Sequence, residues 1–421
     1  MANIVCFGPG PKFKGGISNY NTSLAKTFDK DPNNEVHIVS WTNQYPSIIP
    51  REFVDKSSSS DFIEGTQIKV TYITNYNNPL SWRETARYIT SLNPDKVIFQ
   101  WAISIQGIPM GRIAKWIGKN SVAEIIFDLH FAVQKEGSTI DEQLTKIGIC
   151  NADTYLTHAY KTVTELKKLF PKVTISVNET GMRSDDAKTV IKLFHPVYDL
   201  YQPDVNFDVE NFKNELGLKK HVFLYFGFIR KYKGLHNAIK AFELVTKQRQ
   251  DVSFLICGEE FWATLDTSKF STKVKQLLFA IAQKLFLNTK ENEQNYRPLQ
   301  LIDELDLKHS VVVKNEFIPN EDVHKYFQVA DCCILFYLTA TPSGVESLTY
   351  NFELPILATN VGHFPETIKN GVNGYLADPE NIESMASQMI KFLDHPLPKQ
   401  NVQKAAASMS WDNYVAAILN G

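Results

Sequence analysis

The sequence of 421 residues lacks the features that mark several specialised classes of protein. No uninterrupted apolar run approaches the ~20 residues that a membrane-spanning helix needs. The formal net charge of −2 argues against a nucleic-acid-binding protein and against one held to an anionic membrane by its overall charge. Apolar residues make up 43% and charged residues 21%, which predicts an ordinary globular protein, and the length predicts two domains.

Cysteine is also scarce. The five cysteines have no zinc-type spacing, and their odd number leaves at least one unpaired. They lie in or beside apolar runs, which predicts buried free thiols in a reducing compartment. The first ten residues contain neither a charged n-region nor a cleavage site, so we expect no signal peptide and a cytoplasmic location.

Several catalytic signatures are missing. The sequence has no G-x-G-x-x-G dinucleotide fingerprint and no G-x-S-x-G nucleophile elbow, which argues against a dehydrogenase and an α/β-hydrolase. No Asp-x-Asp pair lies in a cleft-facing loop where it would hold a metal ion, so we predict no metal site. Glu346, Glu353 and Glu366 are candidates for a glycoside hydrolase pair, but the sequence alone does not pair them.

The sequence does contain a long alternation of short apolar runs and amphipathic segments. Such alternation predicts an α/β fold, with parallel sheets covered by helices on both faces. The pattern is interrupted at residues 195–217, where prolines and aspartates indicate a linker. We therefore predict two doubly wound, Rossmann-like domains, residues 1–198 and 199–400, with a ligand cleft between the carboxyl ends of their strands.

The predicted strands cover residues 3–7, 35–40, 68–73, 96–100, 123–127, 152–157 and 173–177 in the first domain, and 222–227, 252–257, 311–315, 331–337 and 356–359 in the second. The predicted helices cover residues 17–28, 82–92, 111–119, 211–216, 235–247, 320–330, 345–352 and 382–392.

One segment, residues 262–295, fits neither alternation. Within it, apolar residues recur at helical spacing over 273–287, and the lysines lie mostly off that face. One interpretation is a helix packed on the domain. The other is a basic amphipathic helix that touches a membrane surface or a partner.

Three loops carry the residues expected at a phosphate site. In each, a strand ends in a turn that leads into a helix, where unpaired backbone N–H groups and the helix dipole attract an anion. The loops contain Gly15 and Gly16, then Arg230, Lys231 and Lys233, and finally the small residues from Thr339 to Gly344. For each loop the alternative is a plain turn or a solvated run of charge.

A further candidate follows the strand predicted at residues 123–127. Asp128 and His130 come at its carboxyl end, where a histidine can hydrogen-bond a sugar hydroxyl. The alternative is a histidine at the edge of the core. His158 is the second candidate of this kind.

Taken in order, these segments resemble a GT-B glycosyltransferase of the retaining family 4, the glycosyl transferases group 1. The resemblance spans nearly the whole chain and is strongest over residues 222–391, in FGFIRKYKGLHNAIKAF, TPSGVESL and LPILATNVGHFPETIKNGVNGYLADPEN. The last helix, within residues 408–421, resembles the terminal helix that crosses back to the first domain in that family.

The resemblance implies a role for each matching residue. It implies catalytic roles for Asp128, His130, Arg230 and Lys233, donor phosphate or sugar contacts for Gly15, Gly16, Ser343, Gly344, Val345 and Glu346, and base contacts for Phe317, Ile318 and Pro319. It implies no cofactor and no metal ion.

The chain also departs from the family pattern. The family's two glutamates, separated by seven residues, would fall on Ala340 and Leu348. Glu346 is shifted by two from the second position, and His363 stands where the family has a glycine. A subset of the family carries a Ser-Gly-Val turn in place of the glutamate signature, and this chain resembles that subset.

The resemblance implies transfer of a hexose, with retention, from a nucleotide-diphosphate sugar to a saccharide or lipid-linked saccharide in cell-surface polysaccharide synthesis. Peripheral contact with the inner face of a membrane would accompany a lipid-linked acceptor. The alternatives are a non-catalytic GT-B subunit or sugar-binding module, and a nucleotide-sugar epimerase of the same fold.

Overall fold

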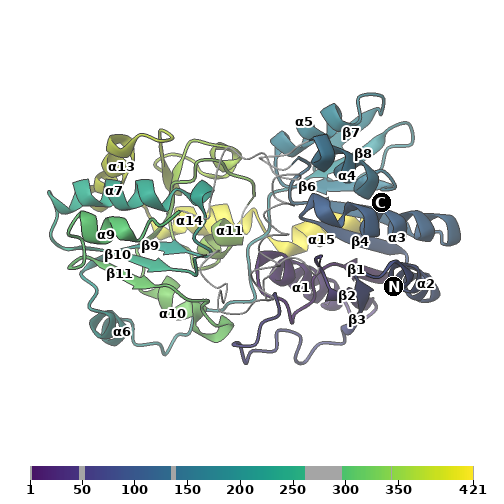
Figure 1. Cartoon of the computed structure of the whole chain (residues 1–421), viewed down its shortest axis with the longest axis horizontal. Coiled ribbons are helices and arrows are strands. Elements are labelled where there is room, and N and C mark those ends of the chain that lie inside the picture. The colour runs from purple at the N-terminus through teal and green to yellow at the C-terminus, as the bar shows by residue number, and fades with distance from the viewer. Residues whose placement is uncertain (1, 47–52, 134–138, 261–295, 343, 421) are drawn as a thin grey trace, which may run out of the picture.

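Two parallel β-sheets organise the protein, one in each half of the chain (Figure 1). The computed structural model describes residues 2–46, 53–133, 139–260, 296–342 and 344–420. The first sheet has eight strands in the order β3-β2-β1-β4-β5-β6-β8-β7, and the second has six in the order β11-β10-β9-β12-β13-β14. Every strand pairing in both sheets is parallel. The predicted α/β fold with two doubly wound sheets is confirmed.

The strands of the first sheet are β1 (Asn3–Phe7), β2 (Glu35–Asn43), β3 (Lys69–Asn75), β4 (Lys96–Trp101), β5 (Glu124–Leu129), β6 (Thr154–Thr157), β7 (Ile175–Asn178) and β8 (Lys188–Lys192). Those of the second are β9 (His221–Phe226), β10 (Val252–Cys257), β11 (Val311–Lys314), β12 (Cys332–Leu335), β13 (Ile356–Thr359) and β14 (Gly374–Ala377).

The helices of the first half are α1 (Gly16–Asp29), α2 (Pro79–Ser91), α3 (Gly107–Asn120), α4 (Thr139–Ile149) and α5 (Tyr160–Leu169). Those that follow are α6 (Val209–Leu216), α7 (Leu235–Thr246), α9 (Gln300–Glu304), α10 (Val323–Gln328), α11 (Gly344–Asn351), α12 (Phe364–Thr367), α13 (Ile382–Asp394), α14 (Lys399–Ala407) and α15 (Trp411–Leu419).

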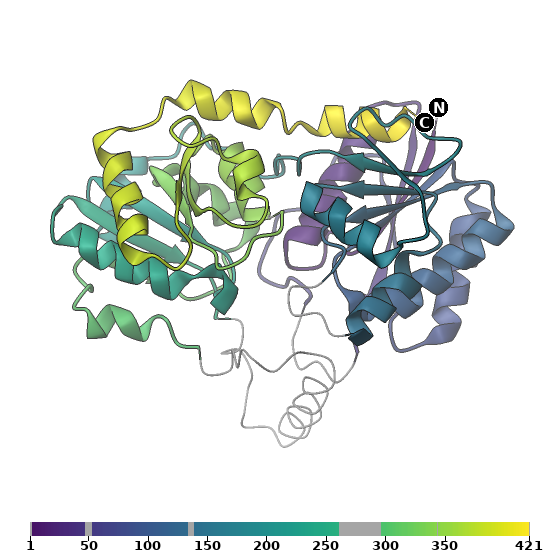
Figure 2. The same cartoon turned by 90° about the horizontal axis from the view of Figure 1, so that it is seen from above.

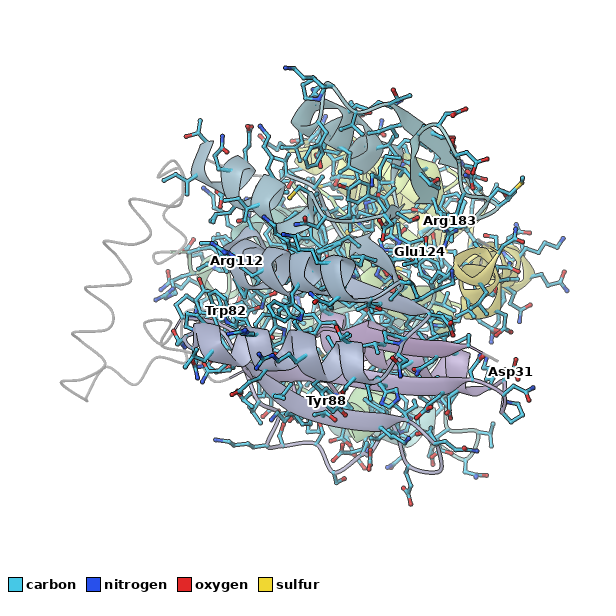
Figure 3. The ribbon with its side chains drawn as sticks, turned by 90° about the vertical axis from the view of Figure 1, so that its right-hand side faces the viewer. Asp31, Trp82, Tyr88, Arg112, Glu124 and Arg183 are labelled. Carbon is cyan, nitrogen blue, oxygen red and sulfur yellow. The ribbon has the colours of Figure 1, made fainter. Side chains whose placement is uncertain are left out.

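The sheet strands bury both faces, which explains their nearly continuous apolar sequences. In β1, Ile4 and Cys6 belong to the core beneath α1 and α15, whereas Val5 and Phe7 belong to the core beneath α2 and α3. This alternation follows from the two-residue period of a strand. Figure 3 shows α2 and α3 lying side by side on the outer face of the first sheet, with Trp82 and Tyr88 on α2.

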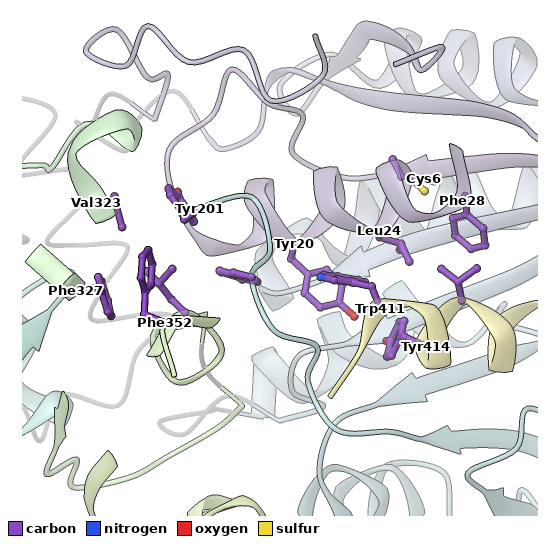
Figure 4. Packing of buried hydrophobic residues seen from close by; sticks show 14 of the residues in the cluster. Cys6, Tyr20, Leu24, Phe28, Tyr201, Val323, Phe327, Phe352, Trp411 and Tyr414 are labelled. Atoms are coloured by element: carbon purple, nitrogen blue, oxygen red, sulfur yellow. The ribbon is translucent and has the colours of Figure 1, made fainter. Parts of the chain in front are cut away.

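One apolar cluster joins the two halves of the chain. Figure 4 follows it from Tyr20 on α1 and Trp411 on α15, which packs against α1, through Tyr201 in the connecting segment, to Phe327 and Phe352 in the second half. The two sheets are thus joined by packing as well as by the chain connection. The predicted boundary between residues 198 and 199 falls between β8 and β9.

The last two helices run along one side of both halves (Figure 2). The final one, α15, packs against α1, and the Trp411 indole N–H donates a hydrogen bond to the Val197 carbonyl oxygen (2.6 Å). At its other end, the Arg183 guanidinium donates to the carbonyl oxygen of Ile418 (2.9 Å). Arg183 is fixed in turn by Glu124, whose pKa is lowered to about 2 because hydrogen bonds from Arg183 and Lys96 outweigh the effect of burial.

Two further predictions concern the burial of the cysteines and a helix over residues 273–287. Four cysteines are buried as predicted, but the prediction is wrong for Cys150, whose side chain is exposed just after α4 ends. The helix expected over residues 273–287 lies outside the described residues. Within the part of the chain that the structure describes, no helix is both long and apolar enough to cross a membrane.

Candidate functional site: a cavity between the two sheets

A cavity of about 250 Å³ lies between the two halves of the chain. Loops at the carboxyl ends of strands from both sheets line it, as expected for ligand sites of doubly wound folds. Its lining includes seven of the predicted site residues: Gly15, Gly16, Lys233, Phe317, Ile318, Gly344 and Val345. Gly15 and Val345, which are more than 300 residues apart in the sequence, thus line the same cavity.

Tyr198 brings two of the predicted phosphate loops together. Its hydroxyl donates a hydrogen bond to the Gly16 carbonyl oxygen (2.7 Å), and its buried ring lies against Gly344. A β-carbon at position 344 would lie 2.7 Å from the Tyr198 ring, so only glycine fits there without a shift. The N-termini of α1 and α11 therefore both open on the cavity, where their dipoles favour an anion.

The cationic loop contributes Lys233 directly. Its side chain is buried, and burial lowers the pKa of its ammonium to about 8, with a further contribution from the charge of Arg230. A β-carbon at Gly227 would lie 3.0 Å from Lys233 Nζ, so the glycine leaves room for the ammonium at the cavity. Arg230 is half-buried and lies with its guanidinium 5.7 Å from the centre of the Tyr232 ring.

Contacts between the two halves run along part of the cavity lining. The Lys14 ammonium lies 4.5 Å from the centre of the Phe317 ring, a cation–π contact. The Asn19 amide donates to the Tyr201 hydroxyl (2.6 Å), which donates to the Asn320 side-chain oxygen (2.9 Å). Ile318 lines the cavity beside Phe317, whereas Pro319 is not among the lining residues.

Glu346 lies away from the cavity, and its predicted role there is not supported by its position. Its carboxylate is buried and accepts hydrogen bonds from the Thr367 hydroxyl and from the His363 ring. Glu346 and His363, both noted as departures from the family pattern, therefore form one buried unit behind α11. Ser343, also predicted to contact phosphate, lies outside the described residues.

Asp128 and His130 are not among the residues that line the cavity. Both side chains are buried, and Asp128 accepts a hydrogen bond from the Tyr20 hydroxyl (2.8 Å). Burial lowers the pKa of His130 to about 3, so its ring is neutral, and it contacts the Gln100 side-chain oxygen (3.0 Å). A direct contact with substrate would require this packing to open.

A cluster of histidines surrounds Asp128. His158 Nε2 lies 3.1 Å from the Asp128 carboxylate, and one potential ligand atom each from Asp128, His130 and His158 lie within 4.8 Å of one another. Burial would raise the pKa of Asp128, but His158 and the Tyr20 hydroxyl hold it below its usual value. His195 continues the cluster to α11, because its Nδ1 lies 2.6 Å from Ser347 Oγ.

Sequence reasoning missed several cavity residues. Tyr198 and Tyr201 belong to the segment interpreted only as a linker, and Lys14 and Asn19 flank the predicted glycine pair. The carboxylates of the lining, Asp55, Glu259 and Glu316, were not predicted either. Proximity to a glycine loop could have suggested Lys14, but the tyrosines became recognisable only from their contacts.

Comparison with known proteins finds a family model that matches most of the second half of the chain. Residues 206–409 match the model of the family described as glycosyl transferases group 1. Two curated proteins are similar to part of the chain at low identity. They are a sucrose synthase of Melioribacter roseus, 25% identical over 191 residues, and the spore coat protein SA of Bacillus subtilis, 22% identical over 221 residues. These matches cover 41% and 50% of this chain, and the chain spans 23% and 51% of the two relatives.

Solved structures support the fold over the whole length. HepE of Anabaena in complex with UDP-glucose is 16% identical, with a TM-score of 0.65, and the match covers 100% of this chain and 98% of HepE. A glycosyltransferase from Rickettsia africae is 14% identical with a TM-score of 0.64, covering 100% of this chain and 96% of that one. At this identity the likeness establishes the fold, which is GT-B.

Proposed function

We propose that the protein transfers a sugar from a nucleotide-diphosphate sugar to an acceptor, since residues 206–409 match the model of the glycosyl transferases group 1 family. The observation that carries the proposal is the meeting of two helix N-termini and the Lys233 ammonium at one cavity. Backbone N–H groups and a buried cation are the groups that a diphosphate requires. Of the structurally similar proteins, HepE binds UDP-glucose.

In more detail, we propose a hexosyltransferase that retains the anomeric configuration and needs neither cofactor nor metal ion. The bond between the sugar's anomeric carbon and the phosphate oxygen breaks as the acceptor oxygen approaches on the same face. The acceptor proton passes to the leaving phosphate oxygen. Lys233, Arg230 and the N-terminus of α11 stabilise the negative charge that develops there.

The other site residues have the roles that the family resemblance implies. Gly15 and Gly16 allow the diphosphate to approach the backbone, and Phe317 to Pro319 hold the base. Ser343 to Val345 contact the distal phosphate and the sugar. Asp128 and His130 act at the sugar when the packing around them opens.

The acceptor is proposed to be a saccharide or a lipid-linked saccharide used in cell-surface polysaccharide synthesis, with the protein in the cytoplasm or at the inner face of the membrane. A non-catalytic GT-B subunit or sugar-binding module is a second candidate, because the family's paired glutamates fall on Ala340 and Leu348. An epimerase is the third.

A donor screen tests the proposal. UDP-, GDP- and ADP-sugars are titrated by calorimetry and then incubated with saccharide acceptors, with nucleotide release as the readout. We expect one nucleotide class to bind and to be released only with acceptor. The variant with Arg230→Ala and Lys233→Ala should lose turnover without loss of thermal stability. Binding of none of these sugars would favour the non-catalytic candidate, and release of a free epimer without acceptor would favour the epimerase.

A further inference from the structure

Three side chains at the ends of two neighbouring strands meet on one face of the first sheet. Asp128 lies in β5 and His130 directly follows that strand, so the two-residue period of a strand puts both on the same face. β6 pairs with β5, with Leu129 opposite Thr157, so His158 comes level with His130. The centres of the two histidine rings are 5.3 Å apart. The topology therefore brings one carboxylate and two imidazoles together from separate segments of the sequence.

The closest approach within this group lacks the geometry of a hydrogen bond. His158 Nε2 lies 3.1 Å from Asp128 Oδ1, yet among the residues that the structure describes neither atom has a hydrogen-bond partner. The second ring nitrogen of His158, Nδ1, has none there either. Two ligands of a tetrahedral metal ion, bound at about 2.0–2.1 Å, are about 3.3 Å apart. The separation of these two atoms is therefore close to that of two ligands of one ion.

All three residues are almost completely buried. Asp128 is 0%, His158 1% and His130 5% exposed. Buried polar atoms nearly always have a hydrogen-bond partner, and a bound ion is one of the recognised reasons for an exception. A carboxylate with two imidazoles is a ligand set that divalent transition metals use in proteins, and it leaves coordination positions for water. The chemistry of this group therefore suits such an ion.

Two tyrosines from the covering helices hold the group in place. The Tyr20 hydroxyl donates a hydrogen bond to Asp128 Oδ2 (2.8 Å), and the other carboxylate oxygen is the one that approaches His158. The Tyr414 ring stacks on the His158 ring, with 5.9 Å between their centres and 25° between their planes. Figure 4 shows Tyr20 on α1 and Tyr414 on α15 next to each other. Outer contacts of this kind orient metal ligands and strengthen metal binding.

We propose that Asp128, His130 and His158 bind one divalent transition-metal ion, such as Zn²⁺. One potential ligand atom of each residue lies within 4.8 Å of the others, so a modest inward rotation of the side chains brings them to bonding distance. The sequence predicts no metal site because it lacks an Asp-x-Asp pair, whereas these ligands come together only when β5 and β6 pair. The proposed transfer reaction uses no metal ion, and metal binding does not rest on it.

A bound ion has a consequence for transfer, and this step does rest on the proposed function. Asp128 and His130 act at the sugar when the packing around them opens. An ion that joins both of them to His158 holds the ends of β5 and β6 together and keeps that packing closed. We therefore expect the ion to inhibit transfer.

The test is the binding of Zn²⁺ and Co²⁺ alone to the full-length protein after dialysis against a chelator. Calorimetry should give one zinc site per chain, and Co²⁺ should develop the visible absorption of a protein-bound ion. Loss of an outer contact weakens metal binding about 10–100-fold, so His158→Ala, which removes a ligand, should weaken it at least about 100-fold. Tyr20→Phe removes only the hydroxyl that holds Asp128 and should weaken binding about tenfold. Since it keeps the ring, it tests the site even where His158→Ala does not fold.

His221 provides the matched control, because it is another histidine with carboxylates nearby. Its ring nitrogens lie 3.6 Å from Asp251 and 4.0 Å from Asp331, but its side chain is 24% exposed. His221→Ala should bind zinc as the wild type does. The proposal is overturned if the wild type binds neither metal, or if it binds no more tightly than His158→Ala and Tyr20→Phe. A loss in His221→Ala as large as that in His158→Ala would also overturn it, since the ion would then be bound at the surface.

Nucleotide release from the donor sugar is the second readout. Zinc should slow release in the wild type, and the zinc concentration that halves the rate should be about ten times higher in Tyr20→Phe. Equal inhibition of the two proteins would overturn the inhibitory role of this site. A protein that binds zinc but shows no transfer with any donor would contradict the proposed function and still support the metal site.

Discussion

The Tyr198 hydroxyl donates a 2.7 Å hydrogen bond to the backbone carbonyl oxygen of Gly16. The tyrosine belongs to the segment that connects the two sheets, and the glycine begins α1. Since the same ring also lies against Gly344, one side chain sets the spacing between the starts of α1 and α11. The geometry of the proposed phosphate site thus depends on Tyr198, which also lines the cavity.

The close contact at Gly344 gives the first prediction. A methyl group there would lie 2.7 Å from the Tyr198 ring, so Gly344→Ala should displace the start of α11. We expect the affinity for the nucleotide of the donor to fall at least about tenfold, which is 1.4 kcal/mol. Calorimetric titration measures this loss.

The matched control is Gly107→Ala, at the start of α3. A β-carbon there would lie 2.1 Å from the Leu144 carbonyl oxygen, and neither residue lines the cavity. This variant should lose thermal stability but keep its nucleotide affinity. Equal affinity losses in the two variants would show that Gly344 has no specific role.

Lys233 gives a prediction about pH. Burial lowers the pKa of its ammonium to about 8, so in the unliganded protein the charge is lost as pH rises through that value. Nucleotide affinity should therefore fall between about pH 7 and 9 in the wild type, because an uncharged amine attracts a diphosphate less. Isothermal titrations across this range measure the profile.

The Lys233→Arg variant is the control, since a guanidinium stays charged throughout the range. Its affinity should be nearly independent of pH even if it is lower overall. A wild-type profile that matches the flat profile of the arginine variant would remove Lys233 from the phosphate site.

The buried unit of Glu346 and His363 gives a prediction about stability. Glu346→Ala would leave the His363 ring without its acceptor, and the Thr367 hydroxyl with only the longer contact to the Phe364 carbonyl oxygen (3.4 Å). A buried hydrogen-bonding group left without its partner costs about 1–3 kcal/mol, so the free energy of unfolding should fall by that order. Urea denaturation measures the change.

The control for this variant is Glu353→Ala. Glu353 pairs with Lys399, whose side chain is 69% exposed, and such surface pairs contribute less than about 1 kcal/mol. A loss for Glu346→Ala no greater than that of Glu353→Ala would contradict the assignment of Glu346 to the core.

The fold was predictable because its signal is local. Strands buried on both faces are nearly continuous apolar runs, and β1, β10 and β13 have the bounds expected from sequence. The segments that were missed carry weaker local patterns. In α4, for example, the exposed Ile140 and Ile147 interrupt the polar face that would mark an amphipathic helix. In β8, two lysines interrupt the apolar run that would mark a buried strand.

The candidate site was predictable only where a loop has a chemical signature. Glycines before a helix and cations after a strand pointed to Gly15, Gly16, Lys233 and Gly344, which all line the cavity. Position in sequence could not show the partners of a residue on α11: Glu346, expected at the ligand, is not among the lining residues and hydrogen-bonds His363 and Thr367 instead. Asp128 and His130 end a strand at the correct edge, yet α1 covers them through Tyr20.

The docking of α15 gives the last prediction. Gly181 has a φ of +85°, and a β-carbon there would lie 1.8 Å from the Ala417 carbonyl oxygen. Gly181→Ala therefore adds a clash to the strain of a left-handed backbone and should detach α15 from the first sheet. Gly217→Ala is the matched control, since Gly217 has a φ of +67° with open space around its β-carbon position. It should cost only the strain, about 1–2 kcal/mol. We expect limited proteolysis to cleave α15 in Gly181→Ala faster than in Gly217→Ala, and equal cleavage rates would mean that the glycine at 181 is not needed for docking.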